Sequence, residues 1–308
     1  MKAGLKVGPN DWEKILKTTK PDCLEVWFRI DWYSKYLKLF KYLNKNKIPF
    51  GLHFWAMIDN KYFPDLLSLD KKINQQTFTL IKKTITIAQK HQAKYVNFHP
   101  ESYRTNLLNL ENSTIKTLNP KQKINRQKSF NQLLFYLKKI TIYANKRKIT
   151  PFLETVPKFM PADFKNIETG RLDPQPSEGL ETEKFIKLSK LNYPICLDIG
   201  HTMGQLITNS KTKLFQYLYQ SAKKMAKTIG LIHITTSIPP FNGVDCHKGI
   251  LKKDFNQKAV PNQKQLIKLL TIFKNKDIWF IPEPKTEMIK NYQALKQIVK
   301  KIENNQKN

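Results

Sequence analysis

Residues 195–202 of the sequence read Ile-Cys-Leu-Asp-Ile-Gly-His-Thr. The stretch begins as an apolar run, which is typical of a strand that is covered on both faces, and it carries Asp198 and His201 at its end. Barrels of parallel strands keep their active sites at the carboxyl ends of those strands, where this carboxylate and this imidazole lie. The number of similar strands along the chain therefore decides the fold.

Seven further strands are predicted around this one, and they alternate with amphipathic helices. The eight predicted strands are residues 2–7, 24–28, 50–55, 95–99, 150–155, 195–199, 231–235 and 278–282. The predicted helices include residues 77–89, 129–146, 182–190, 213–227, 263–274 and 288–302. Eight strands that are each followed by a helix predict an α/β fold, a closed TIM (β/α)8 barrel. An open doubly wound sheet is the alternative, but six strands are more usual there.

The length of 308 residues fits one such barrel with extended loops. We expect a single barrel domain over residues 1–303 and a frayed tail over residues 304–308. Two polar, proline-containing segments, residues 104–127 and 160–179, are predicted to be long loops. Because they follow predicted strands, they should lie on the face that carries the site.

The composition indicates a soluble protein of the cytoplasm. The three cysteines, Cys23, Cys196 and Cys246, are far apart and form no CxxC pair, which argues against disulfides and a cysteine zinc finger. No apolar run is long enough to form a transmembrane helix, so no membrane partner is expected. The first residues lack the apolar segment of a secretory signal and are predicted to form a strand instead.

The formal net charge is +30, from 54 Lys and Arg against 24 Asp and Glu. A surplus of this size favours polyanionic partners such as nucleic acid. Only five of the basic residues are arginine, however, although arginine binds phosphate better than lysine does. The lysine excess therefore fits either a polyanionic substrate or the codon bias of an A/T-rich genome.

The histidines carry the strongest chemical signal. Five of the six lie at or just beyond the end of a predicted strand, and they are His53, His99, His201, His233 and His247. Only His91 lies elsewhere, near the end of a helix. A single histidine in such a place is most often structural, but five together predict a metal site, since imidazole is the commonest protein ligand for metals.

Carboxylates occupy matching positions and strengthen this prediction. They are Glu154, Asp198, Asp245 and Glu283. Any one of them is compatible with a helix cap, but four buried carboxylates around one barrel mouth would repel each other without cations. Mixed nitrogen and oxygen ligands suit Zn²⁺ or Mn²⁺. The sequence therefore predicts a cluster of divalent metal ions.

Six short motifs also resemble those of a known family. In chain order they are HPES (99–102), LET (153–155), DIGH (198–201), IHITTS (232–237), DCH (245–247) and PEP (282–284). They are similar to the motifs of the endonuclease IV family, also called apurinic/apyrimidinic endonuclease family 2, within the xylose-isomerase-like barrels. The resemblance extends from about residue 24 to residue 283.

The resemblance implies about three zinc ions and an activity. One ion would bind His53, His99 and Glu154, a second would bind Glu154, Asp198, His233 and Glu283, and a third would bind His201, Asp245 and His247. The implied reaction is hydrolysis of a DNA phosphodiester 5′ to an abasic site, with Glu154 bridging two metals and Glu283 orienting the nucleophile. The metal-ligand types match the family, whereas several of their neighbours, such as Thr155 and Cys246, differ from it.

Two other functions remain open from the sequence. A sugar isomerase or epimerase of the same superfamily would use one metal held by Glu154, Asp198, His233 and Glu283, with Glu154 and Glu283 transferring protons. A barrel that retains its metal site without catalysis is a further alternative. For abasic DNA, Phe54, Trp55 and Met57 are candidates to fill the gap left by a nucleotide that has turned out of the duplex, and Arg29 is a candidate for contact with phosphate. The alternatives are that the three apolar side chains pack under a loop and that Arg29 pairs with a carboxylate.

Overall fold

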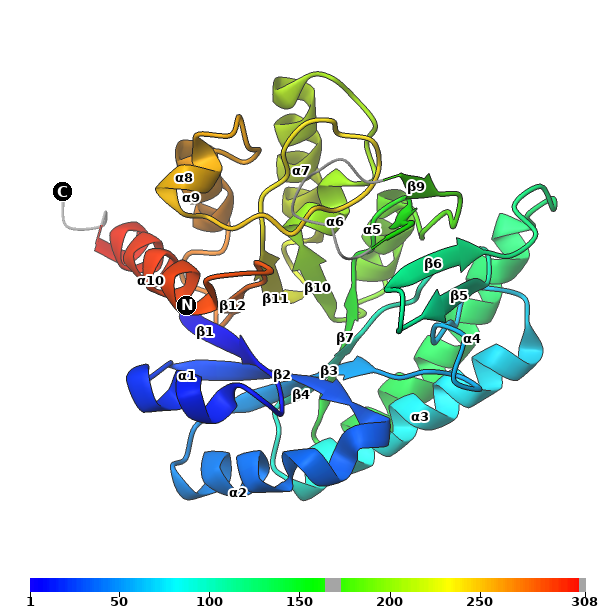
Figure 1. Cartoon of the computed structure of the whole chain (residues 1–308), viewed down its shortest axis with the longest axis horizontal. Coiled ribbons are helices and arrows are strands. Elements are labelled where there is room, and N and C mark those ends of the chain that lie inside the picture. The colour runs from blue at the N-terminus through cyan, green and yellow to red at the C-terminus, as the bar shows by residue number, and fades with distance from the viewer. Residues whose placement is uncertain (164–172, 305–308) are drawn as a thin grey trace.

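The computed structural model describes residues 1–163 and 173–304 and shows a closed barrel of eight parallel strands (Figure 1). The order around the barrel is β1-β12-β11-β10-β7-β4-β3-β2. Their bounds are β1 Lys2–Val7, β2 Cys23–Arg29, β3 Phe50–Trp55, β4 Tyr95–Phe98, β7 Thr150–Glu154, β10 Ile195–Asp198, β11 Ile229–Ile234 and β12 Trp279–Pro282. The predicted TIM (β/α)8 barrel is confirmed, and each predicted strand overlaps one of these eight.

Helices follow the barrel strands and surround them (Figure 1). Their bounds are α1 Trp12–Thr18, η1 Ile30–Tyr36 (a 3-10 helix), α2 Leu37–Lys45, α3 Lys71–Lys90, α4 Arg126–Asn145, α5 Thr182–Lys190, α6 Ile199–Met203, α7 Lys211–Met225, α8 Lys252–Phe255, α9 Gln263–Thr271 and α10 Met288–Asn304. All six helices named from the sequence have a counterpart. Asn304, predicted to belong to a frayed tail, closes α10, and residues 305–308 lie outside the described part of the chain.

Capping side chains fix where the two longest helices begin. Asp70 accepts a hydrogen bond from the Ile73 amide at 3.0 Å, and Asn125 accepts one from the Lys128 amide at 3.0 Å. These caps satisfy amide groups that lack a partner in the first turn. Helices α3 and α4 therefore start before the apolar periodicity that predicts residues 77–89 and 129–146.

The two predicted loops contain short strands that pair with each other over the barrel mouth. Residues 104–127 form the antiparallel hairpin of β5 (Asn106–Asn109) and β6 (Thr114–Thr117). Residues 160–179, of which 164–172 lie outside the described part, contribute β8 (Met160–Pro161) and β9 (Pro174–Gln175). The Ile115 amide donates to the Ala162 carbonyl at 2.9 Å and joins the two pairs. We call these four strands the cover.

Strand side chains fill the barrel interior in two layers of different polarity. The deeper layer is apolar and consists of Cys23, Tyr95, Phe152, Cys196, Leu231, Trp279 and Ile281. Gly51 makes room in it, because a Cβ atom at this position would overlap the ring of Tyr95. Along each strand the residue two positions further on faces the same interior, so the next layer lies at the mouth.

The cysteines and the helices can be compared with the predictions made from composition. All three cysteines are buried and free, as expected. Within the described ranges, none of the helices has the length and apolar character needed to cross a membrane.

Candidate metal centre

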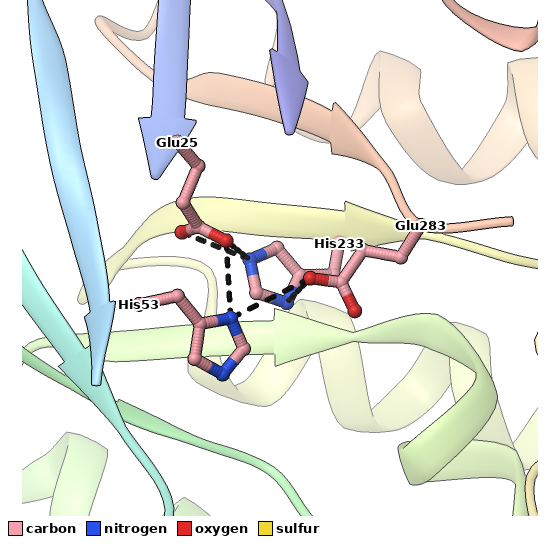
Figure 2. A group of neighbouring side chains, drawn as sticks. All are labelled: Glu25, His53, His233 and Glu283. Carbon is pink, nitrogen blue, oxygen red and sulfur yellow. Dashed lines mark hydrogen bonds and ion pairs between the residues drawn. The ribbon is translucent and has the colours of Figure 1, made fainter. Parts of the chain in front are cut away.

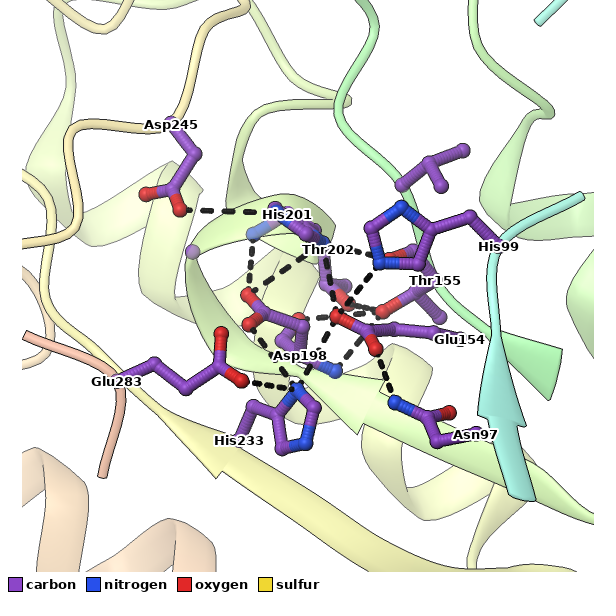
Figure 3. Close-up of polar contacts among 12 residues, drawn as sticks. Asn97, His99, Glu154, Thr155, Asp198, His201, Thr202, His233, Asp245 and Glu283 are labelled. Carbon is purple, nitrogen blue, oxygen red and sulfur yellow. Dashed lines mark hydrogen bonds and ion pairs between the residues drawn. The ribbon is translucent and has the colours of Figure 1, made fainter. Parts of the chain in front are cut away.

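The layer at the barrel mouth gathers all nine predicted metal ligands. Figure 3 shows His99, Glu154, Asp198, His201, His233, Asp245 and Glu283 among them. Six of them come from the barrel strands or the residues directly after them, namely His53, His99, Glu154, Asp198, His233 and Glu283. His201 lies on the short helix α6, and Asp245 and His247 lie on the loop after β11. All except His99 and His247 are buried. Their donor atoms form three groups, each compact enough to hold a metal ion; the first two share Glu154, and the third shares no residue with them.

Glu154 connects two of these groups. Its Oε2 atom lies 3.5 Å from His53 Nε2, and its Oε1 atom lies 3.2 Å from His99 Nε2. The same Oε1 atom is 3.1 Å from His233 Nδ1. Asn97, two positions before His99 on the neighbouring strand, donates its side-chain amide to Glu154. One carboxylate thus faces the ligands of two candidate metals, as a bridging ligand requires.

His233 stands at the centre of the second group. Its Nδ1 atom lies 3.1 Å from Glu283 Oε1 and 3.8 Å from Asp198 Oδ2, in addition to its contact with Glu154. Three carboxylates therefore converge on one nitrogen atom. A divalent ion among them would balance the negative charge of these carboxylates.

The third group lies nearer to the loops. The Oδ2 atom of Asp245 is 3.8 Å from His201 Nε2 and 3.3 Å from His247 Nε2. Gly200 permits this approach, since a Cβ atom there would collide with the Asp245 carboxylate. Asp198 accepts the amide of His201 at 2.7 Å and so caps α6 while its other oxygen faces the second group.

Buried atoms without a hydrogen-bond partner show that the ligand set fits metal ions. Among the described residues they include His99 Nε2, Asp198 Oδ2 and Asp245 Oδ2, one from each candidate group. An unpaired buried polar atom costs about 1–3 kcal/mol. Coordination to one cation in each group would satisfy all three atoms.

The outer nitrogens of the imidazoles support the same interpretation. His201 Nδ1 lies 2.8 Å from the Thr155 carbonyl, and His247 Nδ1 lies 3.3 Å from the Glu283 carbonyl. His99 Nδ1 faces the carboxylate of Glu101 at 3.6 Å. Histidines that bind metals in proteins usually hold the second ring nitrogen in this way.

The charges of the mouth shift the pKa values of its groups. Burial would lower the pKa of His201, but the carboxylates of Asp198, Glu154 and Asp245 outweigh it and raise that pKa to about 10. Burial also opposes protonation of His99, yet Glu154 and Glu101 raise its pKa to about 9. Without metal, protons on these rings therefore balance the carboxylates, and binding of a divalent ion must displace them.

The pKa values of two carboxylates at the mouth shift in opposite directions. Burial would raise the pKa of Glu154, but the imidazoles of His233, His99 and His53 hold it well below its ordinary value. The pKa of Asp198 rises to about 6, because it is buried and because Asp245 and Glu154 repel its charge.

Two charged residues at the mouth were not predicted from the sequence. Glu25 on β2 is fully buried and lies 3.1 Å from His53 Nδ1 and 3.0 Å from His233 Nε2. Lys6 on β1 forms ion pairs with Glu283 and, at 3.4 Å, with Glu25. Both lie inside a strand rather than at its end, and a charged residue within an apolar strand is the signal that would have found them.

The mouth opens into a pocket of about 240 Å³. Its walls include aromatic and other apolar side chains, among them Trp27, Phe54, Trp55, Phe63 and Met160. Of the four predicted substrate contacts, Phe54 and Trp55 line this pocket. Arg29 and Met57 line a neighbouring groove instead.

Arg29 is held in place by its neighbours. Its guanidinium group pairs with Asp31 at 2.7 Å and lies over the rings of Trp32 and Trp55. The pairing with a carboxylate, considered from the sequence as the alternative to phosphate contact, is therefore the arrangement observed.

The sequence model of a protein family, the xylose isomerase-like TIM barrels, matches residues 15–260 of this chain. The chain belongs to this family. A search of curated proteins gives no match. Solved structures with this fold include sugar epimerases and endonuclease IV, so the fold does not specify one reaction.

Three solved structures illustrate the range of the xylose isomerase-like fold. A D-tagatose 3-epimerase-like protein is 15% identical, with a TM-score of 0.67, and 99% of each chain is covered. Endonuclease IV from Thermus thermophilus is 11% identical, with a TM-score of 0.58, over 98% of this chain and 100% of that one. Another protein from Thermus thermophilus, studied after soaking with ZnCl2, is 13% identical, with a TM-score of 0.59, over 98% and 99%. At such identities the likeness shows the fold alone.

Proposed function

We propose that the protein is a metal-dependent phosphodiester hydrolase of the endonuclease IV type, with abasic sites in DNA as its substrate. The observation that carries this proposal is the set of three ligand groups that meet at one mouth and together use all nine predicted ligands. A single-metal enzyme needs only the group of Glu154, Asp198, His233 and Glu283. The group of His201, Asp245 and His247 would have no ligand role in such an enzyme.

Divalent ions such as Zn²⁺, or alternatively Mn²⁺, would neutralise the phosphate and make water more acidic. The chain's own residues hold the geometry for this chemistry. Glu154 belongs to both of the first two groups, and Glu283 lines the pocket. The apolar pocket walls would exclude water around an abasic nucleotide that has turned out of the duplex.

Sugar epimerisation is the second candidate, and the pocket favours it. A volume of about 240 Å³ with apolar walls suits a small molecule. In this reaction Glu154 and Glu283 would act as the acid and base on opposite sides of a sugar carbon, and His233 contacts both of them at 3.1 Å.

Metal analysis and two activity assays distinguish these candidates. Purified protein would be analysed for zinc and manganese per chain, then incubated with a duplex that contains one abasic site and, separately, with a panel of ketohexoses. The hydrolase predicts about three ions per chain and strand cleavage 5′ to the abasic site. About one ion per chain, an intact duplex and an epimerised ketose would overturn it in favour of the second candidate.

A further inference from the structure

Glu25 contacts two candidate metal ligands, His53 and His233 (Figure 2). Its Oε1 atom is 3.1 Å from His53 Nδ1 and 3.0 Å from His233 Nε2. A carboxylate oxygen has two lone pairs and can accept a hydrogen bond from each ring. The second oxygen accepts the Tyr95 hydroxyl at 2.9 Å, so the carboxylate is held from below by the apolar layer.

The two rings turn opposite nitrogens toward Glu25. His53 presents Nδ1 to it and keeps Nε2 for Glu154, whereas His233 presents Nε2 and keeps Nδ1 for Glu154, Asp198 and Glu283. A neutral imidazole carries one proton, and only the nitrogen without it can bind a metal. Acceptance by Glu25 thus places the proton on Nδ1 of His53 and on Nε2 of His233.

We propose that Glu25 is a positioning residue that orients His53 and His233 and fixes their tautomers, so that one buried carboxylate prepares ligands of two different metals. Lys6 competes with this arrangement. Its ammonium group lies 2.6 Å from His53 Nδ1, and a hydrogen bond donated there would place the ring proton on Nε2, which could then not bind metal. The proposal therefore requires Lys6 to donate to Glu25 and Glu283 instead when metal is bound.

The inference rests on the metal binding of the proposed function but not on its substrate. Three variants test it by zinc affinity in competition with a chelator. Glu25→Leu removes both acceptor positions and is expected to weaken zinc binding about 10–100-fold, the usual effect of losing such a support. Glu25→Gln keeps an oxygen at the Oε1 position and should retain most of the affinity. Tyr95→Phe removes the hydrogen bond that holds the second carboxylate oxygen but leaves the acceptor of both rings in place, so it should weaken zinc binding less than Glu25→Leu does.

Nitrogen-15 NMR of the imidazoles adds a readout that a purely structural role would not change. In the zinc-bound wild type the proton should reside on Nδ1 of His53 and on Nε2 of His233. Glu25→Gln should preserve this pattern, and the comparison still holds if Glu25→Leu fails to fold. Equal zinc affinity in Glu25→Leu and wild type, or the reverse tautomers in the wild type, would overturn the inference. A wild type that binds no zinc would instead contradict the proposed function.

Discussion

Lys6 is a largely buried cation beside the carboxylates of the candidate metal centre. Its side chain is 13% exposed and pairs with Glu25 and Glu283. In the metal-free protein it therefore offsets part of the negative charge of the mouth. When divalent ions bind, the same charge competes with them for Glu283.

Replacement of Lys6 should have opposite effects on the metal-free protein and on metal binding. We expect Lys6→Met to destabilise the metal-free protein by about 3–5 kcal/mol, the usual cost of removing one partner of a buried ion pair. Zinc binding should tighten, because the competing ammonium is gone. Urea unfolding with a chelator and with saturating zinc measures both effects, and an equal loss of stability in both forms would contradict this role.

The third ligand group gives a prediction of its own. His201→Ala and Asp245→Ala should each lower the metal content by about one ion per chain and abolish phosphodiester cleavage, because the group of His201, Asp245 and His247 loses a ligand. The fold should persist, since stability resides in the core below the mouth. Metal analysis, thermal unfolding and the cleavage assay check these outcomes. Full cleavage by either variant would show that this group is dispensable.

The prediction of single residues from the sequence had a clear physical limit. The nine ligands stand out because histidines and carboxylates at strand ends must converge in a closed barrel. Glu25 and Lys6 lie before the ends of β2 and β1, where charge is expected only if the barrel interior is itself polar. Their partners come from other strands, so no motif in the sequence brings either residue together with its partners.

At the scale of elements, strands were easier to predict than the structure over the mouth. The barrel strands are apolar on both faces, so their composition alone identifies them. The cover consists of strands of two and four residues with polar faces, held by pairing with each other and by a small cluster of Phe63, Leu108 and Ile115. Such pairing is non-local and leaves little periodicity in the sequence.

This cluster makes the stability of the cover testable. Leu108→Ala removes a buried side chain that pairs across the hairpin with Ile115, and it should cost about 2 kcal/mol, the low end for such truncations. Hydrogen exchange should accelerate in the cover and not in the barrel. Leu110→Ala, in the same hairpin but 45% exposed, is the control and should change neither. Uniform acceleration over the whole chain would argue against a separate cover.

His91, the histidine outside the mouth, gives the pH dependence of one element. It caps α3, stacks on Phe40 with ring centroids 4.5 Å apart and bonds to the Tyr33 hydroxyl at 2.8 Å. Burial and, to a lesser extent, Lys90 lower its pKa. The unfolded chain thus takes up the proton more readily, so its contribution to stability is complete above the unfolded pKa of about 6.5 and is lost as the pH falls through the folded pKa.

His91→Phe keeps an aromatic ring and removes the titration. We expect the free energy of unfolding of this variant to decline less steeply between about pH 8 and pH 5 than that of the wild type. Tyr33→Phe, which removes only the hydrogen bond, should keep the steep decline. Parallel slopes for wild type and His91→Phe would assign the pH dependence to other groups.

At the scale of the whole molecule, the net charge of +30 predicts a response to salt. If DNA is the substrate, its affinity should fall about tenfold or more between roughly 50 and 200 mM salt, as phosphate contacts release counterions. Fluorescence anisotropy with a labelled abasic duplex measures this dependence. A flat salt response would favour genome composition as the origin of the lysines and a small neutral substrate.

Gly51 has no side chain, and the space this leaves affects the candidate metal centre indirectly, through the position of Tyr95. The ring of Tyr95 occupies the space above this glycine, and its hydroxyl holds the carboxylate that faces two metal ligands. Any larger residue at position 51 would push the ring and lift that hydroxyl. Substitutions at positions 51 and 95 are therefore expected to show epistasis. A larger residue at position 51 should disturb Glu25 while Tyr95 is present, and a smaller residue at position 95 should relieve that effect.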